Sequence, residues 1–195
     1  MSMKDFDQIK EKLKIRLDTA RYEHTVGVMY TAGCLAMAHG YCMEQAMLAG
    51  LLHDCAKCMG YDAMVQLCEE SQIAISSSEQ ANKSLLHAKA GAIEARRTYH
   101  INDTEILHAI QVHTTGEPGM SMLDKIIYIA DYIEPGRDQA PNLDYLRKLA
   151  YEDLDACVAE ISYDTLMYLD TKKQVIDPAT EKTYHFYKQY RKERN

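Results

Sequence analysis

The chain has 195 residues, of which 22 are lysine or arginine and 29 are aspartate or glutamate, so its formal net charge is −7 at pH 7 with neutral histidines. This acidic balance argues against a protein that binds nucleic acid or a membrane surface broadly, because both functions need a positive field. It leaves room for a phosphorylated small molecule, since bound metal ions can reverse the charge of a local site. With 47% hydrophobic residues, the chain can bury the core of a single domain.

Cysteine usage and the amino-terminal segment bear on location. The six cysteines show no disulfide-scaffold pattern, and the lysine-rich start "MSMKDFDQIKEKLKIRL" carries no apolar leader. No apolar stretch is long enough to span a bilayer. We therefore expect a cytoplasmic protein that has no membrane or nucleic-acid partner.

Apolar residues recur at spacings of three and four along most of the chain, which predicts an all-α fold. Methionine is frequent, with 11 residues, and proline is rare, with 4, a balance that favours helices over sheets. In chain order, the expected helices span residues 5–18, 21–39, 43–57, 61–71, 86–99, 103–113, 122–133, 143–151, 153–169 and 180–192.

Two helix starts carry a specific signal. Asn102 is followed three residues later by Glu105, and Ser121 is followed by Asp124, so both pairs predict capping boxes that satisfy free amide groups. Residues 75–84, "ISSSEQANKS", are expected to form a loop.

Five segments contribute six side chains that could meet in the core of a helical bundle. Each lies near the apolar side of a predicted helix, and metal sites in bundle cores are built in this way. The set is His24, His53, Asp54, His87, His113 and Asp131. A single core histidine is more often hydrogen-bonded than a ligand, and an aspartate near a helix end is more often a cap. Asp131, however, lies inside "IIYIADYIEP", where a carboxylate without a counter-charge would be costly to bury.

The other four histidines are expected to be structural: His39, His100, His108 and His185. His108 precedes His113 by five residues, which places the two about 140° apart around a helix, so they should not share a metal. Glu105 and His108 form one Glu-x-x-His pair, but a ferritin-like site needs a second such pair.

The stretch "LLHDCAKCMG" also contains Cys55-x-x-Cys58, a spacing that can indicate thiol exchange. Here the motif follows an apolar helical run at its carboxyl end, where the helix dipole disfavours a thiolate. We therefore favour a metal site over a redox pair, which stays open as the alternative. The remaining cysteines are expected to be inert small hydrophobic residues: Cys34, Cys42, Cys68 and Cys157.

The order of the six candidate ligands resembles the HD superfamily of metal-dependent phosphohydrolases in its binuclear form. The neighbouring text narrows the resemblance to the bacterial YqeK family, through "RYEHTVGV", "LAGLLHDCAK", "HAKAGA", "IQVHTTG", "LDKIIYIADYIEPGR" and "DPAT". Members of that family hydrolyse diadenosine tetraphosphate symmetrically to two ADP. The resemblance implies one HD domain over residues 1–195, a helical bundle with a metal site in its core (about 18–135) and a carboxyl-terminal helical extension (about 143–195).

The resemblance also implies roles for individual residues. One metal ion would be held by His24, His53, Asp54 and Asp131, and a second by Asp54 as a bridge with His87 and His113. The implied metal is iron, two ions in all, and manganese or cobalt would suit the same ligands. Asp54 and Lys57 would serve catalysis, and the attacking group would be a metal-activated water.

Substrate contacts follow from the resemblance as well. The implied contacts are Arg21, Lys57, His87, His113, Arg137, Thr171, Lys172, Lys173, Gln174, Val175, Ile176, Asp177 and Thr180. Lys57 and Arg137 would meet phosphate, and residues 171–180 would close over adenosine. The chain departs from the family at residues 182–184, where Lys-Thr-Tyr replaces an Ala-Arg-Asn-like helix start. Without the resemblance, Lys57 is equally a helix-end cation and Arg137 a solvated loop residue.

The ligand set leaves three other functions open. It could hydrolyse another phosphoester, such as a nucleoside monophosphate or a cyclic dinucleotide. It could activate oxygen at a di-iron site, or bind nucleotide without turnover as a sensor. The sequence also leaves an oligomer open.

Overall fold

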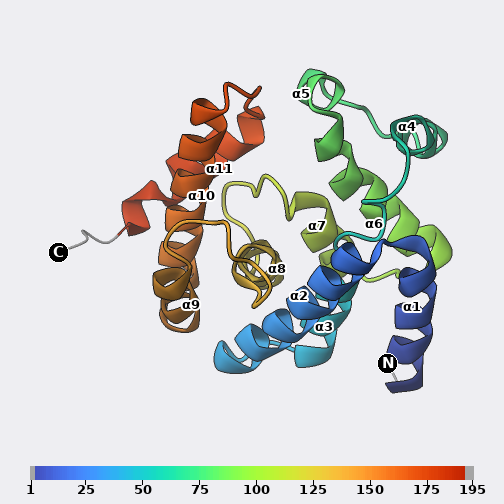
Figure 1. The fold of residues 1–195 in the computed structure, drawn as a ribbon, viewed down its shortest axis with the longest axis horizontal. Helices are drawn as coiled ribbons and strands as arrows, with labels where there is room; N and C mark the ends of the chain where they lie inside the picture. The colour runs from blue at the N-terminus through green and yellow to red at the C-terminus, as the bar shows by residue number, and fades with distance from the viewer. Residues whose placement is uncertain (1–2, 192–195) are drawn as a thin grey trace.

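The computed structural model describes residues 3–191, with side chains from residue 6 onward, and the described chain consists of helices joined by turns and loops, without a strand (Figure 1). The all-α prediction is therefore confirmed. The elements are α1 (Met3–Arg16), α2 (Thr19–Ala38), α3 (Met43–Leu52), α4 (Tyr61–Glu70), α5 (Ser77–Ala81), η1 (Lys83–Leu85), α6 (Leu86–Thr98), α7 (Thr104–Val112), α8 (Met122–Ile133), α9 (Leu143–Glu152), α10 (Leu154–Thr171), α11 (Pro178–Tyr187) and η2 (Lys188–Tyr190). Residue 192, the end of the last predicted helix, lies outside the described residues.

Helix α8 lies at the centre of the bundle, in contact with α2, α3, α7, α9 and α10 (Figure 1). Its apolar residues Ile126, Ile127 and Ile129 are fully buried, which explains why "LDKIIYIADYI" is apolar on nearly every side. Among the described residues, the main hydrophobic core runs from Ile9 in α1 to Tyr187 in α11, and a smaller separate cluster joins α4 to α6. Because Asp131 lies on this central helix, its carboxylate is carried into the bundle.

Helices α2 and α3 cross very closely, and a glycine makes this possible. A Cβ atom at Gly50 would lie 3.0 Å from Met29 Cα and 3.2 Å from Met29 N, both of them backbone atoms. Only a residue without a side chain allows this approach without a backbone shift. The crossing brings the ligand candidate on α2, His24, towards the end of α3 and His53.

Helix α3 ends earlier than the sequence predicted. It stops at Leu52, and residues 53–58 form tight turns in which Cys55 N donates to Leu52 O (3.1 Å) and Lys57 N donates to Asp54 O (2.9 Å). These three-residue spacings replace the four-residue spacing of the α-helix. The predicted helix over 43–57 was therefore too long, and His53 and Asp54 stand just past its end.

Two other local predictions were wrong. Residues 75–84 contain the short helices α5 and η1, and α5 begins with a capping box between Ser76 and Glu79. Helix α7 is capped by Asp103, which accepts from the amides of residues 105 and 106, and not by Asn102. The capping box of Ser121 with Asp124 is confirmed.

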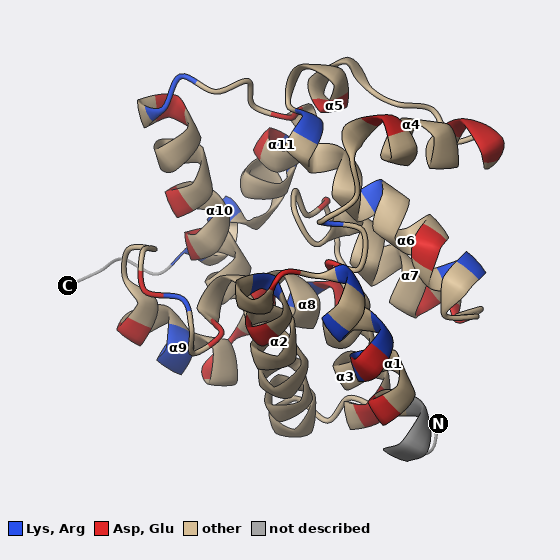
Figure 2. Ribbon diagram, turned by 45° about the vertical axis from the view of Figure 1, so that its right-hand side comes forward, with Lys and Arg blue, Asp and Glu red and all other residues tan. Residues whose placement is uncertain are grey.

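Two general surface properties agree with the composition. Figure 2 shows acidic residues along α4 and α10, with basic residues scattered among several helices, in line with the net charge of −7. Among residues 3–191, the helices are all too short or too polar to cross a bilayer.

Candidate metal centre

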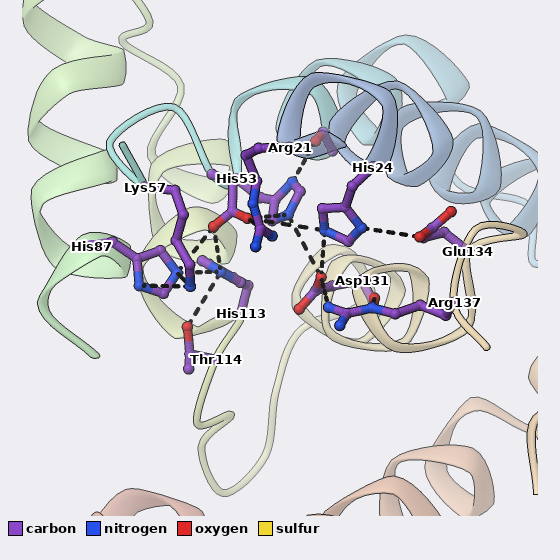
Figure 3. A network of polar contacts seen from close by, with 12 residues as sticks. Arg21, His24, His53, Lys57, His87, His113, Thr114, Asp131, Glu134 and Arg137 are labelled. Atoms are coloured by element: carbon purple, nitrogen blue, oxygen red, sulfur yellow. Dashed lines mark hydrogen bonds and ion pairs between the residues drawn. The ribbon is translucent and has the colours of Figure 1, made fainter. Parts of the chain in front are cut away.

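The fold brings all six candidate ligands together (Figure 3). They come from α2 (His24), the turn after α3 (His53 and Asp54), the start of α6 (His87), the end of α7 (His113) and α8 (Asp131). His24 Nε2 lies 3.0 Å from Asp131 Oδ1, and His53 Nε2 lies 3.5 Å from Asp54 Oδ2 and 3.7 Å from Asp131 Oδ1. His87 Nε2 and His113 Nε2 lie 3.0 and 3.7 Å from Asp54 Oδ1.

Hydrogen bonds on the far side of three imidazole rings determine which nitrogen faces the cluster. His53 Nδ1 donates to Gly50 O and His113 Nδ1 donates to Ile110 O, both over 2.7 Å, and His87 Nδ1 contacts the carbonyl oxygen of residue 84. Each acceptor lies three residues earlier in the chain. With the proton on Nδ1, Nε2 carries a lone pair towards the cluster, as a metal-binding histidine requires.

The cluster contains buried polar atoms that protein groups alone do not satisfy. His24 Nε2, His53 Nε2 and Asp54 Oδ1 are buried and have no hydrogen-bond partner. The Nε2 atoms of His87 and His113 lie 3.1 Å apart, although both rings place their proton on the other nitrogen. Leaving such atoms unpaired is costly, and a cation among them would remove the cost. The donor set therefore fits a metal ion.

The ligand atoms fall into two overlapping groups. His24, His53 and Asp131 form one, His53, Asp54 and His113 form the other, and within each group the ligand atoms lie within 4.8 Å of one another. Each group could hold a divalent ion. The donors are imidazole and carboxylate without thiolate, a set that suits iron, manganese, cobalt or zinc.

Electrostatics keep the ligands in the protonation state that a metal needs. Burial alone would raise the pKa of Asp54, but its interactions with His53, His113 and His87 hold that pKa well below the ordinary value. Burial would also raise the pKa of Asp131, but its interactions with His24, His53, His113 and Arg137 outweigh burial and lower that pKa. Burial lowers the pKa of His87, so its imidazole stays neutral. Metal binding requires carboxylates that are ionised and imidazoles that are neutral.

Three cationic side chains reach the same ligands. Arg21 Nη1 donates to Asp54 Oδ2 (2.7 Å), Arg137 Nη2 donates to Asp131 Oδ1 (3.0 Å), and Lys57 Nζ lies 3.2 Å from His87 Nε2. Burial is the main cause that lowers the pKa of Lys57. All three residues were singled out from the sequence, and the fold places each one beside a ligand.

Sequence reasoning missed Glu134, which supports the fourth histidine. His24 Nδ1 donates to Glu134 Oε1 over 3.1 Å, and the backbone amide of Gly136 donates to Glu134 Oε2 over 2.6 Å. The Glu134 side chain is buried, and a Cβ atom at Gly27 would lie only 2.6 Å from Glu134 Oε2. The sequence features that could have indicated this contact lie far apart in the chain. They are Gly27, one turn after His24, and Glu134 itself, at the end of an apolar helix. Thr114 was also missed, although its hydroxyl donates to His113 Nε2 (3.2 Å).

The segment predicted to cover adenosine is mostly exposed. Residues 171–175 are exposed, Ile176 and Asp177 are half-buried, and Thr180 is buried. Asp177 caps α11 and accepts a hydrogen bond from Ser78 in α5. Residues 182–184 are where the sequence departs from the family pattern. Within them, Thr183 is buried and donates to Thr115 O (3.0 Å), so this position joins α11 to the loop after α7. The substrate contacts of residues 171–180 stay a prediction.

The two thiols of Cys55-x-x-Cys58 have different surroundings. Cys55 is buried, its Sγ donates to Gly91 O (3.4 Å), and burial raises its pKa. Cys58 is exposed. A buried, protonated thiol is a poor nucleophile, which favours the metal interpretation of this stretch. Cys68 and Cys157 are buried, whereas Cys34 and Cys42 are exposed, and the inertness expected of these four thiols stays a prediction.

The histidines that were set aside lie outside the ligand cluster. His39 Nε2 contacts Ala150 O over 2.7 Å at the end of α2. His108 lies between Asp124 (3.0 Å) and Glu117 (3.2 Å), and these two carboxylates raise its pKa against the opposing effect of burial. His108, Glu117 and Asp124 form a third group that could hold an ion, but both ring nitrogens of His108 already have carboxylate partners. His108 and His113 belong to different groups, as the helical spacing predicted.

Comparison with known proteins agrees with the fold and the site. The family model for the HD domain matches residues 21–136, and the chain therefore belongs to the HD domain family. It is similar to two proteins named "Bis(5'-nucleosyl)-tetraphosphatase, symmetrical". The one from Bacillus subtilis is 39% identical over 89% of this chain and 92% of its own length, and the one from Halalkalibacterium halodurans is 40% identical over 89% and 91%. A crystal structure from Clostridium acetobutylicum, described as a predicted HD superfamily hydrolase involved in NAD metabolism, has a TM-score of 0.91, 38% identity, and coverage of 94% of this chain and 97% of its own.

Proposed function

We propose that the protein is a metal-dependent hydrolase that splits diadenosine tetraphosphate symmetrically into two molecules of ADP. The observation that carries the proposal is the group of buried ligand atoms without a hydrogen-bond partner, His24 Nε2, His53 Nε2 and Asp54 Oδ1, among which a cation would fit. The similarity to symmetrical tetraphosphatases over most of both chains supplies the reaction.

In this proposal His24, His53, Asp54 and Asp131 hold one metal ion, and Asp54 with His87 and His113 holds a second. Iron is the proposed metal because the family resemblance implies it, and the donor set of imidazole and carboxylate without thiolate would suit it. When bound, such ions supply the Lewis acidity that allows water to attack a phosphoanhydride at neutral pH.

In this proposal the cationic residues near the ligands bind the phosphate groups of the substrate. Arg21, Arg137 and Lys57 each contact a ligand side chain, so a small rotation of each would carry its charge onto a polyphosphate at the cluster. An arginine contributes a fork of donors that fits phosphate oxygens. These residues would stabilise the negative charge that grows on the departing ADP. This field explains how an acidic protein accepts a highly anionic dinucleotide.

Three further features belong to the proposal. Residues 171–180 would cover one adenosine, which is supported by the hydrogen bond between Ser78 and Asp177 in a pocket that also includes Thr114. The chain would form a single domain with its HD core at about 18–135, supported by the main hydrophobic core, which includes residues from α1 to α11. A cytoplasmic location is supported by the six free cysteines, which suit a reducing compartment.

The test begins with protein purified without air and without a metal-affinity tag. Metal content is measured first, and the products formed from diadenosine tetraphosphate are then separated by chromatography. His53→Ala and Asp54→Ala should abolish both the bound metal and ADP formation, whereas His185→Ala, at an exposed histidine in α11, should change neither.

Other outcomes would select another function. ATP and AMP as products would contradict symmetrical cleavage. Bound metal with no turnover of this substrate would reopen the other phosphoester substrates, oxygen activation and nucleotide sensing. Absence of metal, with unchanged behaviour of both variants, would overturn the proposal and direct attention to Cys55 and Cys58.

A further inference from the structure

The row of ligands has a pocket at each end. In Figure 3, His24, Glu134 and Arg137 lie at one end of the row, and His87 and Thr114 lie at the other. The first pocket has a volume of about 370 Å³ and is lined by Arg21, His24, Tyr132, Glu134 and Arg137, among others. The second has a volume of about 440 Å³ and includes Thr114, which donates to His113.

The first pocket combines groups that suit a nucleotide. Arg21 and Arg137 lie beside the ligands, where they can meet phosphate. The same lining contains Tyr132, which offers an aromatic ring, and Asp138 and Gln139, which offer polar groups to ribose hydroxyls or a base edge. Stacking of a base on an aromatic ring, together with a few polar contacts, is the usual chemistry of a small-molecule site.

The second pocket is built from other elements and has a different lining, with lysines in place of arginines. It lies between α5, α6, the loop after α7 and the start of α11. Its lining carries Lys89 and Lys182 beside the carboxylates Glu79, Glu117 and Asp177. Lys89 pairs with Glu79 (2.8 Å), Lys182 lies in α11, and Ser78 and Gln111 contribute hydrogen-bonding groups. Its volume is close to that of the first pocket, and both lie within the range of about 300–1,000 Å³ that is typical of ligand sites.

We propose that each pocket takes one ADP half of the substrate, so that the central phosphoanhydride lies over the ligand row. This inference rests on the proposed function and adds a second nucleotide subsite, at Tyr132, Asp138 and Gln139, to the one expected near residues 171–180. Water adds to one of the two central phosphorus atoms, and the bond from that atom to the bridging oxygen breaks. The bridging oxygen leaves with the other half, the protons of water pass to solvent, and both products are ADP.

The presence of a pocket at each end of the ligand row accounts for which phosphoanhydride bond of the substrate is hydrolysed. A site with one nucleoside pocket would fix the distance from one adenosine to the reacting bond, but it would not bind the other half of the substrate. With a pocket at each end, both halves must fit, and only a four-phosphate bridge places its middle bond at the ligands. The cleavage position then depends on binding as well as on chemistry.

Pocket-filling variants test the inference. Ala140→Phe narrows the first pocket, Ala179→Phe narrows the second, and Ala38→Phe, at an exposed position of α2 that lines neither pocket, is the control. Calorimetric titration of the metal-loaded protein with ADP should give two sites per chain for the unchanged protein and for the control. Each single variant should retain one site, and the double variant should retain none. Each single variant should also lose about tenfold or more in kcat/KM for diadenosine tetraphosphate, which corresponds to ~1.4 kcal/mol.

The outcomes separate this inference from the proposed function. One ADP site per chain in the unchanged protein, together with ADP production from the dinucleotide, would overturn the two-pocket inference alone. Two sites in the Ala140→Phe variant, with its fold intact by circular dichroism, would do the same. Failure of the unchanged protein to form ADP from diadenosine tetraphosphate would overturn the proposed function itself.

Discussion

Removal of Glu134 should weaken metal binding through His24 alone. Three of the four cluster histidines donate Nδ1 to a carbonyl oxygen of their own segment, so their orientation survives most side-chain changes. His24 instead donates to a carboxylate that comes from 110 positions farther along the chain. A carboxylate acceptor fixes the ring and makes its other nitrogen a stronger donor to a metal.

The expected size of the effect follows from this geometry. Loss of such an outer partner typically reduces metal affinity by about 10–100-fold, or ~1.4–2.7 kcal/mol. Glu134→Ala should show the full loss, whereas Glu134→Gln, whose amide oxygen can still accept from Nδ1, should lose less. Gly27→Ala should act in the same direction, because its new Cβ would lie 2.6 Å from Glu134 Oε2 and displace that carboxylate.

The assay is competition between the apoprotein and a chelator of known affinity. The absorption spectrum of the cobalt-loaded protein is recorded as well, because it reports ligand geometry independently of activity. Glu117→Ala, at a carboxylate that contacts His108 outside the cluster, is the matched control. Metal affinity and cobalt spectrum that are both unchanged in a folded Glu134→Ala variant would refute the positioning role.

The remaining predictions concern the close helix crossing, a peripheral histidine and the thiols. Gly50→Ala should destabilise the fold by about 1–3 kcal/mol in urea unfolding, because its Cβ would lie 3.0 Å from Met29 Cα; an unchanged midpoint would contradict the close approach. The raised pKa of His108 means that its pairing with Asp124 stabilises the fold below its ordinary pKa of 6.5 and that this stability is lost as pH rises through the higher folded value. The stability difference between the protein and His108→Gln should therefore shrink with rising pH, and a difference that grows would refute the assignment. Cys58→Ser should leave metal content and ADP formation unchanged, and loss of either would revive the thiol alternative.

The sequence by itself determined the helical class, the capping box at Ser121 and the identity of the six candidate ligands. These properties are local or compositional: apolar periodicity fixes which side of a helix is buried, and a buried histidine or aspartate needs a partner wherever it lies. The sequence around the ligands also resembled the YqeK family closely enough to indicate the reaction.

Only the tertiary structure decided how those residues meet. Glu134 lies far from His24 in the chain, and no local pattern links a glycine at position 27 with a glutamate beyond α8. The early end of α3 depends on the turn that delivers His53 and Asp54 into the cluster. The pockets at the two ends of the ligand row are bounded by segments from both halves of the chain. Sequence periodicity specifies the buried face of each helix, but contacts between distant faces depend on how the whole bundle packs.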